Sequence, residues 1–393
     1  MSEPNTAPVR WDQFPSHAFA VGGAMAGVCL IGWFLEPQQF FRSYLTAYLF
    51  ALGFPLGCLA LLMLHHLVGG EWGLMIQRLL EAGVTTLPPM ALLFLPVIAG
   101  MSDLYLWARP DAVATDPLLQ QKAAYLNAPF FVLRAALYFA IWIGLGYFLN
   151  RWSLEGERGT DATLTRRLQG LSGPGLVLYG LTVTFAAIEW AMSLEPHWYS
   201  TIYGMMFMLG YGLAALALMI FVVFWLSDLE PLSRVMTADH FHDLGNLLFA
   251  LVMFWAYLGF SQYLIIWMAN LQEEIPWYLH RTAGGWMAVA ISLLVFQFIL
   301  PFFLLLCRAT KRAAGALAGI AALILVMRWV DLFWLVTPAF HPQGFYFHWL
   351  DLTTTIGVGA LWAALFVRSF QKHSLLPLHD PRVTAAMAAV ERA

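Results

Sequence analysis

Ten apolar stretches, each long enough to cross a bilayer as a helix, constrain this chain more than any other feature of its sequence. A hydrocarbon core of about 30 Å requires roughly 20 apolar residues in a helix. Charged residues make up only 11% of the 393 residues, less than half the share of roughly 25% found in soluble globular proteins. The stretches are continuously apolar and do not alternate as barrel strands do, which predicts an all-α membrane protein. The expected spans are Ala18–Leu35, Tyr44–Leu67, Val84–Ser102, Pro129–Leu149, Gly175–Leu194, Thr201–Leu226, Leu244–Ala269, Ala283–Cys307, Ala313–Val336 and Trp349–Phe370.

The distribution of positive charge predicts the orientation of these spans. The tails and loops on the side of the N-terminus carry fourteen Lys and Arg residues, with Arg78 counted among the loop cations, and those on the opposite side carry four. Because Lys and Arg are enriched in cytoplasmic loops, both termini are expected in the cytoplasm. Residues 1–17, which show no signal-peptide pattern, and residues 371–393 are then cytoplasmic tails, and Arg151–Ser172 is a long cytoplasmic loop.

A short pattern repeats between the two halves of the chain. Glu189 and Asp331 each lie seven residues before a proline that closes their span. Both acids fall on the same side of the membrane, as a parallel repeat requires. The pattern predicts two four-helix bundles, spans two to five (residues 44–194) and spans six to nine (residues 201–336), flanked by the first and last helices. Chance is the alternative explanation, since Glu81 precedes a proline by the same spacing.

Four ionisable residues lie inside the predicted spans. Arg134 and Glu189 each lie about five residues from the outer end of their spans, so both sit roughly 8 Å below the same surface and can pair if the helices touch. Arg328 and Asp331 are three residues apart and therefore share one helix face. Two interpretations stay open. The four residues form neutralising pairs that hold helices in register, or they belong to a proton path or a quinone pocket, in which a carboxylate takes up a proton released by a redox cofactor.

Further polar residues extend this set. Tyr257, Ser261 and Gln262 lie in the seventh span, within the segment Phe254–Arg281, and polar groups inside a membrane are expected to face protein or water. Asp351 enters the tenth span and is interpreted as a helix-end residue. The predicted proton path comprises Glu189, Asp331, Arg328, Arg134, Tyr257, Ser261, Gln262, His65, His66 and Asp351.

The histidines and cysteines argue against bound redox metals. None of the 11 histidines falls in the middle of a span, so no membrane haem is expected. The 3 cysteines are single and widely spaced, which excludes the ligand sets of iron–sulfur clusters. His65 and His66, at the cytoplasmic end of the second span, are interpreted as solvated loop groups or as the mouth of a proton half-channel, because imidazole titrates near neutral pH. No motif indicates a metal site, a nucleic-acid partner or a soluble catalytic domain.

The ten spans, the repeat, Tyr125-Leu126-Asn127 before the fourth span and the block from Phe260 to Tyr278 (FSQYLIIWMANLQEEIPWY) together resemble a known family. They are similar to the NrfD/PsrC-type membrane subunits of respiratory complexes, and in particular to the smaller of the two such subunits of bacterial alternative complex III. The resemblance covers essentially the whole chain and is most specific at Ser261–Tyr278.

The resemblance implies a non-haem subunit of a quinol:electron-acceptor oxidoreductase, in a respiratory or photosynthetic electron transport chain of the bacterial inner membrane. Such a subunit has no redox centre of its own and is not catalytic alone. The implied partners, besides membrane lipid, are a larger paralogous subunit, an iron–sulfur subunit, multihaem cytochrome c subunits and a terminal oxidase. The implied ligand is a quinone, menaquinone or ubiquinone, at unidentified residues, and the implied role is a proton path. Two other functions stay open: a structural anchor of the same complex and a stand-alone secondary transporter.

Overall fold

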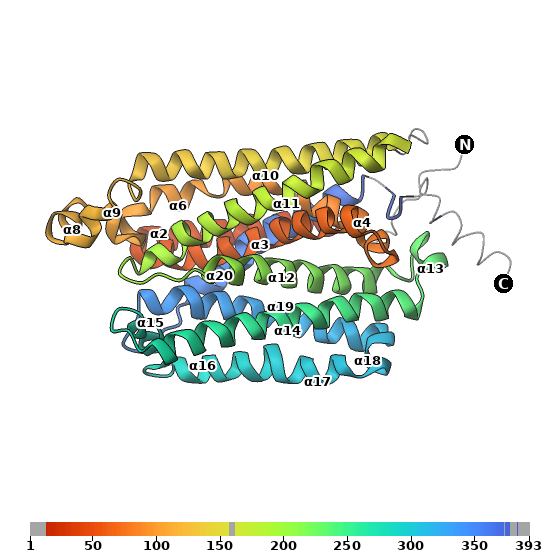
Figure 1. Ribbon diagram of the computed structural model, residues 1–393. Helices are drawn as coiled ribbons and strands as arrows, with labels where there is room; N and C mark the ends of the chain where they lie inside the picture. Colours follow the sequence, from red (N-terminus) through yellow and green to blue (C-terminus); the bar gives the residue numbers. More distant parts are fainter. Residues whose placement is uncertain (1–12, 157–161, 373, 378–382, 384–393) are drawn as a thin grey trace.

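The computed structural model describes residues 13–156, 162–372, 374–377 and 383, and within these ranges the regular structure is helical throughout. Among the described residues, ten helical segments are long and apolar enough to cross a membrane, and they lie side by side along one common direction (Figure 1). The predicted all-α fold with ten transmembrane helices is therefore confirmed. Most of the predicted tails, residues 1–17 and 371–393, lies outside the described residues.

Most spans are single helices, and two are interrupted. The single ones are α2 (Phe14–Leu35), α3 (Pro37–Val68), α10 (Ala128–Gly156), α11 (Ala162–Trp190), α12 (Tyr203–Leu226), α14 (Ala238–Ala269), α19 (Ala314–Val336) and α20 (Trp349–Phe370). The third span is α4 (Glu71–Val84), α5 (Leu87–Leu92) and α6 (Leu95–Ala99), and the eighth is α16 (Trp286–Leu293), a π-helical turn (Leu294–Ile299) and α17 (Leu300–Leu306). Short connecting helices are α7 (Met101–Leu104), α8 (Pro110–Thr115), α9 (Pro117–Lys122), α13 (Leu232–Val235), α15 (Ile275–Thr282) and α18 (Arg308–Arg312).

Several helices continue well beyond the predicted apolar stretches. The third span begins at Glu71, not at Val84, and α10 and α11 run through most of the predicted loop Arg151–Ser172. Hydropathy detects only the part of a helix inside hydrocarbon, whereas the helix itself continues while its own backbone bonds are made. The interpretation of Arg78 as a loop cation is wrong, because Arg78 is buried within α4 and pairs with Glu81.

The centre of the molecule is formed by α3 and α12, which pack against each other. The most apolar stretch of α3 is 83% buried and that of α12 is 72% buried, against 17% for α2. Glycine allows the two helices to approach closely, since a Cβ atom on Gly57 would lie 2.1 Å from the carbonyl oxygen of Tyr211. This contact joins the two halves of the chain, and the division into two four-helix bundles stays a prediction.

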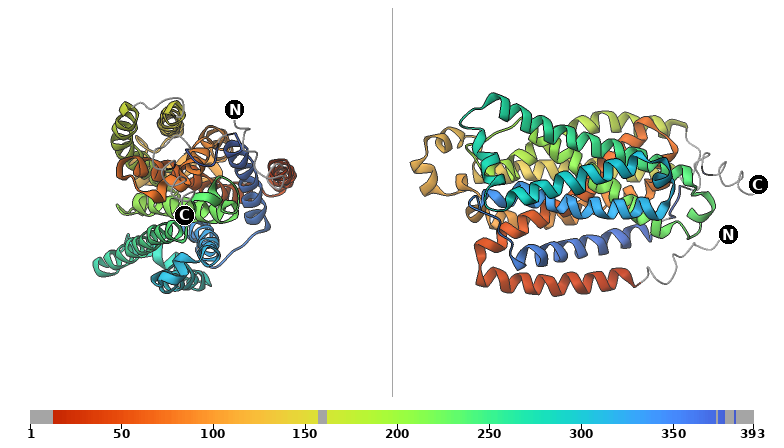
Figure 2. Two further views of the ribbon diagram at one scale, coloured as in Figure 1. Left: turned by 90° about the vertical axis from the view of Figure 1, so that its right-hand side faces the viewer. Right: turned by 90° about the horizontal axis from the view of Figure 1, so that it is seen from below.

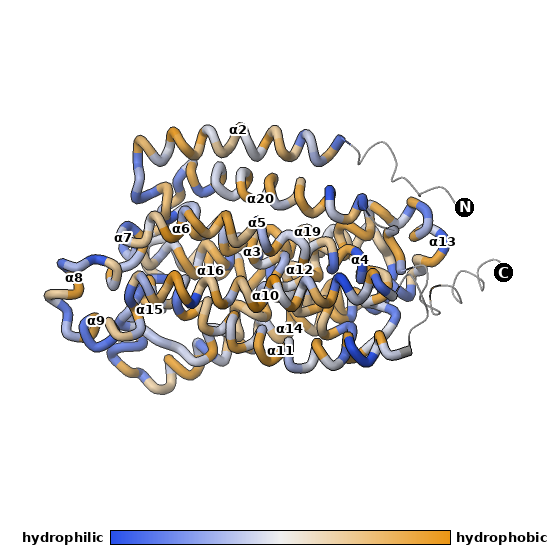
Figure 3. The backbone as a smooth tube through the Cα atoms, turned by 90° about the horizontal axis from the view of Figure 1, so that it is seen from above, coloured by the Kyte–Doolittle hydropathy of each residue, from blue (hydrophilic) through white to orange (hydrophobic). Residues whose placement is uncertain are grey.

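The first and last spans form a pair at one edge of the molecule. Figure 2 shows α2 outermost with α20 between it and the remaining helices, and α2 packs mainly on α20. The contact again uses a small residue: a Cβ atom on Gly32 would lie 2.4 Å from Leu350 Cδ2. The other face of α2 is exposed and apolar, and hydrophilic residues gather at the two ends of the helices (Figure 3). We call the end where α2 begins the Phe14 end, and the opposite end, which carries α8, α9 and α15, the α15 end.

The interruptions of the third span coincide with its prolines. Proline has no N–H to donate, so carbonyl groups one turn earlier lose their helical partner. Two tyrosines of α3 donate to carbonyl groups in this region: Tyr44 Oη to Leu93 O at 2.7 Å and Tyr48 Oη to Met90 O at 2.9 Å. Neighbouring side chains therefore satisfy backbone groups of the broken helix, as a broken span inside a membrane requires.

Candidate functional site

A buried carboxylate near the α15 end is the centre of the first polar cluster, which we call the Glu189 site. Glu189, on the last turn of α11, is fully buried, and its Oε1 atom accepts three hydrogen bonds. Arg134 Nε donates at 2.6 Å, Tyr125 Oη at 2.5 Å and Tyr138 Oη at 2.7 Å. The predicted pairing of Arg134 with Glu189 is confirmed. The two tyrosines were not predicted as site residues: Tyr125 lies in the turn before the fourth span, and Tyr138 lies about three turns into α10.

The two charges of the Glu189 site are not fully satisfied by the protein. Glu189 Oε2 and Arg134 Nη2 are buried and have no hydrogen-bond partner among the described residues. The guanidinium carbon of Arg134 lies 4.0 Å from the ring centres of both Tyr125 and Phe130, which stabilises its charge by cation–π attraction. Burial, together with the hydrogen bond to Glu189, raises the pKa of Tyr125, which lies just outside the span. Tyr125 therefore stays a neutral donor at physiological pH.

A second buried carboxylate, on α19, forms the Asp331 site. Arg328 Nη1 donates to Asp331 Oδ2, and both side chains are buried, so the predicted pair on one helix face is confirmed. Trp255 Nε1 of α14 also donates to Asp331 Oδ2, at 3.3 Å. The guanidinium of Arg328 packs against the backbone of α12, because a Cβ atom on Gly210 would lie 2.1 Å from Arg328 Nη2.

The π-helical turn of the eighth span adds a residue to the Asp331 site that the sequence reasoning missed. Gln297 lies in this turn and is fully buried. In the amide orientation that satisfies both of its polar atoms, it donates to Met327 O at 2.9 Å and accepts from Trp255 Nε1 at 3.0 Å. Single π-turns inside α-helices occur frequently at functional sites. A glutamine in an apolar run with a proline four residues later was the available signal.

The prediction that the polar residues of the seventh span face the interior beside Asp331 is only partly right. Tyr257 is 64% exposed, and the most apolar stretch of α14 is only 22% buried. Gln262 is buried, but it accepts from Ser200 Oγ at 2.5 Å and belongs to a different contact. Ser261 is partly exposed. The residue of α14 that reaches Asp331 is Trp255.

An arginine outside the predicted path forms a third buried charge near the α15 end. Arg281, on α15, is 1% exposed, although the predicted spans Leu244–Ala269 and Ala283–Cys307 place it in the loop between them. It contacts Glu195 Oε2 at 2.7 Å, donates to Leu335 O at 2.7 Å, and stacks at 3.8 Å on Trp277. His280 Nδ1 lies 2.9 Å from the other oxygen of Glu195. This cluster fastens the connection between the seventh and eighth spans to α19.

A fourth polar cluster lies toward the Phe14 end and was also missed as a site. Glu81 is buried on α4 and accepts from Gln77 Nε2 at 2.9 Å and from Ser153 Oγ at 2.6 Å. Arg78 Nη1 donates to its other oxygen at 2.5 Å. We call these four residues the Glu81 cluster. The available sequence signal was the spacing of Glu81, three residues after Arg78, which allows the two to pair on one helix face. The predicted spans place this position in a loop.

The remaining predicted path residues occupy separate places. His65 lies in the last turn of α3 and is buried against Gly73, so its interpretation as a solvated loop group is wrong. Its neighbour His66 lies on the same turn. Asp351 accepts from His348 N at 2.8 Å and from Ser43 Oγ at 2.5 Å. It therefore caps the start of α20, as predicted for a helix-end residue.

These features define the chain as a multi-pass, all-α integral membrane protein with buried, arginine-paired carboxylates at both ends of its helices. No protein-family model matches the chain, and a comparison with curated proteins found no match.

Proposed function

We propose that the chain is a non-haem membrane subunit of a quinol:electron-acceptor oxidoreductase, of the ActF type of alternative complex III, and that it contributes a proton path. In this proposal it lies in a bacterial inner membrane with both termini in the cytoplasm, beside a larger paralogous subunit, an iron–sulfur subunit and multihaem cytochrome c subunits. A quinone is a ligand of the complex. The observation that carries the proposal is the buried Glu189 carboxylate, one oxygen atom of which has no hydrogen-bond partner in the part of the chain that the structure describes.

The geometry of the Glu189 site suits reversible protonation. An ionised carboxylate in a membrane interior is costly unless paired, and Arg134 supplies the compensating charge on the Oε1 side. All three hydrogen bonds converge on Oε1, so a proton can bind to Oε2 without breaking any of them. Unpartnered polar atoms in buried positions are rare and require an explanation. A proton-carrying role provides one.

The carboxylates of the Asp331 site and of the Glu81 cluster are further groups that can bind protons along such a path. Asp331 lies in the half of the helices toward the α15 end, as Glu189 does, whereas Glu81 lies toward the Phe14 end. With the predicted orientation, protons would enter from the cytoplasm near Glu81 and reach the carboxylates of the outer half. The exposed aromatic face of α14, which includes Tyr257, Phe260 and Trp267, would then contact lipid or the larger paralogous subunit.

The test is made on the native complex, solubilised gently and purified through a tag on this chain. We expect multihaem and iron–sulfur subunits to co-purify, and Glu189→Gln and Asp331→Asn to lower proton uptake coupled to quinol oxidation by an order of magnitude or more, a scale typical of losing a general acid–base group. Glu273→Gln, at an exposed position, is the matched control. Normal turnover and proton uptake in both variants would refute the proton path.

Two observations favour alternative functions. The pairing of each buried acid with an arginine suits a structural anchor of the same complex, in which the charges hold helices in register. Intact assembly with unchanged chemistry in both variants supports the anchor. The two interruptions of the third span suit a secondary transporter, because such proteins build sites from broken helices. Purification of the chain without redox subunits supports the transporter.

A further inference from the structure

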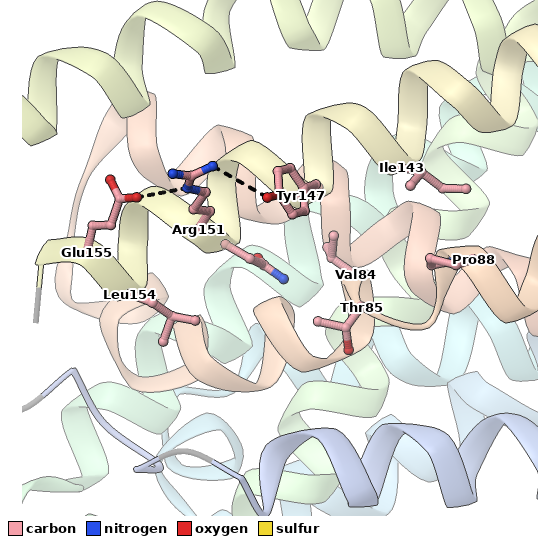
Figure 4. Close-up of a pocket in the computed structure, with 10 residues that line it drawn as sticks. Val84, Thr85, Pro88, Ile143, Tyr147, Arg151, Leu154 and Glu155 are labelled. Carbon is pink, nitrogen blue, oxygen red and sulfur yellow. Dashed lines mark hydrogen bonds and ion pairs between the residues drawn. The ribbon is translucent and has the colours of Figure 1, made fainter.

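A cavity of about 590 Å³ lies between α10 and the α4–α5 segment (Figure 4). These parts of the helices lie in the half of the molecule toward the Phe14 end (Figure 1). Its volume falls within the range of roughly 300–1,000 Å³ that is usual for small-molecule sites. Thr85, Pro88 and Tyr147 line it and are exposed, so the cavity opens on the side of the molecule. In a membrane-spanning segment, that side faces lipid.

One part of the cavity is apolar. Val84 and Pro88 line it from the third span, and Ile143 and the ring of Tyr147 line it from α10. The two walls meet at Gly146, where a Cβ atom would lie 2.4 Å from Val84 Cγ1. This part suits a hydrocarbon chain, because burying apolar surface from both walls and from the chain is favourable.

The part nearer the end of α10 carries one positive and one negative group. Arg151 Nε lies 2.8 Å from Glu155 Oε1, and both side chains line the cavity and are about half exposed, at 57% and 45%. An exposed ion pair four residues apart on a helix contributes little to stability, because water screens both charges. A ligand that brings a charge for each partner can therefore open this pair at little cost.

Asn150 adds a hydrogen-bond acceptor between these two parts. Its Nδ2 atom donates to the backbone carbonyl of Glu81 at 3.0 Å, which fixes the orientation of the amide. Oδ1 is then buried without a partner among the described residues, and the residue lines the cavity. A ligand with an N–H or O–H group at this position would satisfy it.

We propose that the cavity binds one phospholipid with a primary-ammonium head group, of the phosphatidylethanolamine class. The phosphate binds the guanidinium of Arg151, the ammonium binds the carboxylate of Glu155 and Oδ1 of Asn150, and the upper part of one acyl chain lies along Val84, Pro88 and Ile143. A purely anionic head group would leave Glu155 facing a like charge, and a choline head group has no N–H to donate. With the predicted orientation the lipid belongs to the cytoplasmic leaflet. This inference does not depend on the proton path.

The test measures lipid retention on the intact protein. The full-length chain, in its native complex if it has one, is reconstituted into nanodiscs of equal parts phosphatidylethanolamine, phosphatidylcholine and phosphatidylglycerol with added menaquinone, and co-released lipids are identified by native mass spectrometry. We expect phosphatidylethanolamine to be retained above its share of the bilayer. Arg151→Gln and Glu155→Gln should each lower that retention about tenfold, the scale of one lost charge-assisted hydrogen bond. Arg166→Gln, on the exposed surface of α11, should leave it unchanged.

The other outcomes each overturn the proposal. Equal retention of phosphatidylcholine shows that the ammonium N–H groups are not recognised. Preferential retention of phosphatidylglycerol, unaffected by Glu155→Gln, assigns an anionic lipid instead. Retention of menaquinone assigns the cavity to a quinone, and no retention above the bulk composition shows that no ligand is held. Ile143→Trp tests whether the retained lipid lies in this cavity, because the larger side chain fills the apolar part. It should abolish retention, while the melting temperature of the protein stays within a few degrees of wild type.

Discussion

Arg134 on α10 donates from Nε to Glu189 Oε1 on α11 at 2.6 Å, so two helices are joined by an ion pair that is almost wholly buried. Removing one partner of such a pair leaves a buried charge uncompensated and typically costs about 3–5 kcal/mol, whereas replacing both by apolar residues costs little. Arg134→Met should therefore lower the unfolding midpoint in detergent strongly. The double variant Arg134→Met/Glu189→Leu should recover most of the loss. A double variant as unstable as the single one would contradict this account.

Trp255→Phe should weaken the Asp331 site selectively. The substitution keeps an aromatic ring but removes the Nε1 donor that Asp331 and Gln297 share. Losing one buried hydrogen bond to a charged group costs about 1.5–3 kcal/mol. Tyr257→Phe is the matched control, because Tyr257 is two residues away on the same helix and largely exposed. Thermal unfolding of the two variants in the same detergent compares them, and equal stability would show that the Trp255 bond is unimportant.

The contrast between Trp255 and Tyr257 shows what the sequence could and could not predict about the site. Depth in the membrane follows from counting residues, which is why the Arg134–Glu189 pair was predicted correctly. The sequence does not reveal which face of a helix is buried when the helix is apolar on every side. Residues two apart point about 200° apart on a helix of 3.6 residues per turn, so choosing Tyr257 placed the polar contact on the wrong face. From the middle of α14 to its end, the buried residues are Val252, Leu258, Gln262 and Ile266.

The ends of the helices were the second source of error. Hydropathy gave the number of spans and their order, because ten long apolar runs allow few alternatives. It placed the start of the third span too late, at Val84 and not at Glu71, and therefore assigned Arg78 to a loop. It also assigned Arg281 to a loop. Both arginines are buried because neighbouring groups compensate their charge. The partner of Arg78 is Glu81, three residues away, whereas the partners of Arg281 are distant in sequence. For Arg281 the partners are Glu195 and Leu335 O.

Arg281→Met should destabilise the protein by about 3–5 kcal/mol, since Glu195 would lose its buried partner. Arg281→Lys keeps the charge but cannot contact Glu195, Trp277 O and Leu335 O at once, because lysine lacks the planar fork of arginine. The stability of Arg281→Lys should therefore lie between that of Arg281→Met and that of the wild type. Arg166→Met, at an exposed position, should change the unfolding midpoint little. Full stability of Arg281→Lys would show that charge alone matters.

Acid should destabilise the protein partly through His341. Burial, together with the nearby charge of Arg42, lowers the pKa of this residue, so the folded protein binds fewer protons than the unfolded chain below a pH of roughly 6.5, the ordinary histidine value. Stability then falls as pH falls through that value, by at most about 1.4 kcal/mol per pH unit for one proton. His341→Gln should flatten the decline of melting temperature between neutral pH and pH 5. An unchanged slope would assign the acid sensitivity to other groups.

Gly210→Ala should disrupt the Asp331 site without touching either of its charges. A Cβ atom at this position would lie 2.1 Å from Arg328 Nη2 and 2.6 Å from its guanidinium carbon, so the arginine must move away from the face of α12 and its contact with Asp331 must change. Gly212→Ala is the matched control on the same helix, because nothing lies within 4 Å of its added atom. Since alanine favours helices more than glycine does, Gly212→Ala should be neutral or slightly stabilising in thermal unfolding. If Gly210→Ala behaves the same way, the close approach of Arg328 to α12 does not contribute to the stability of the protein.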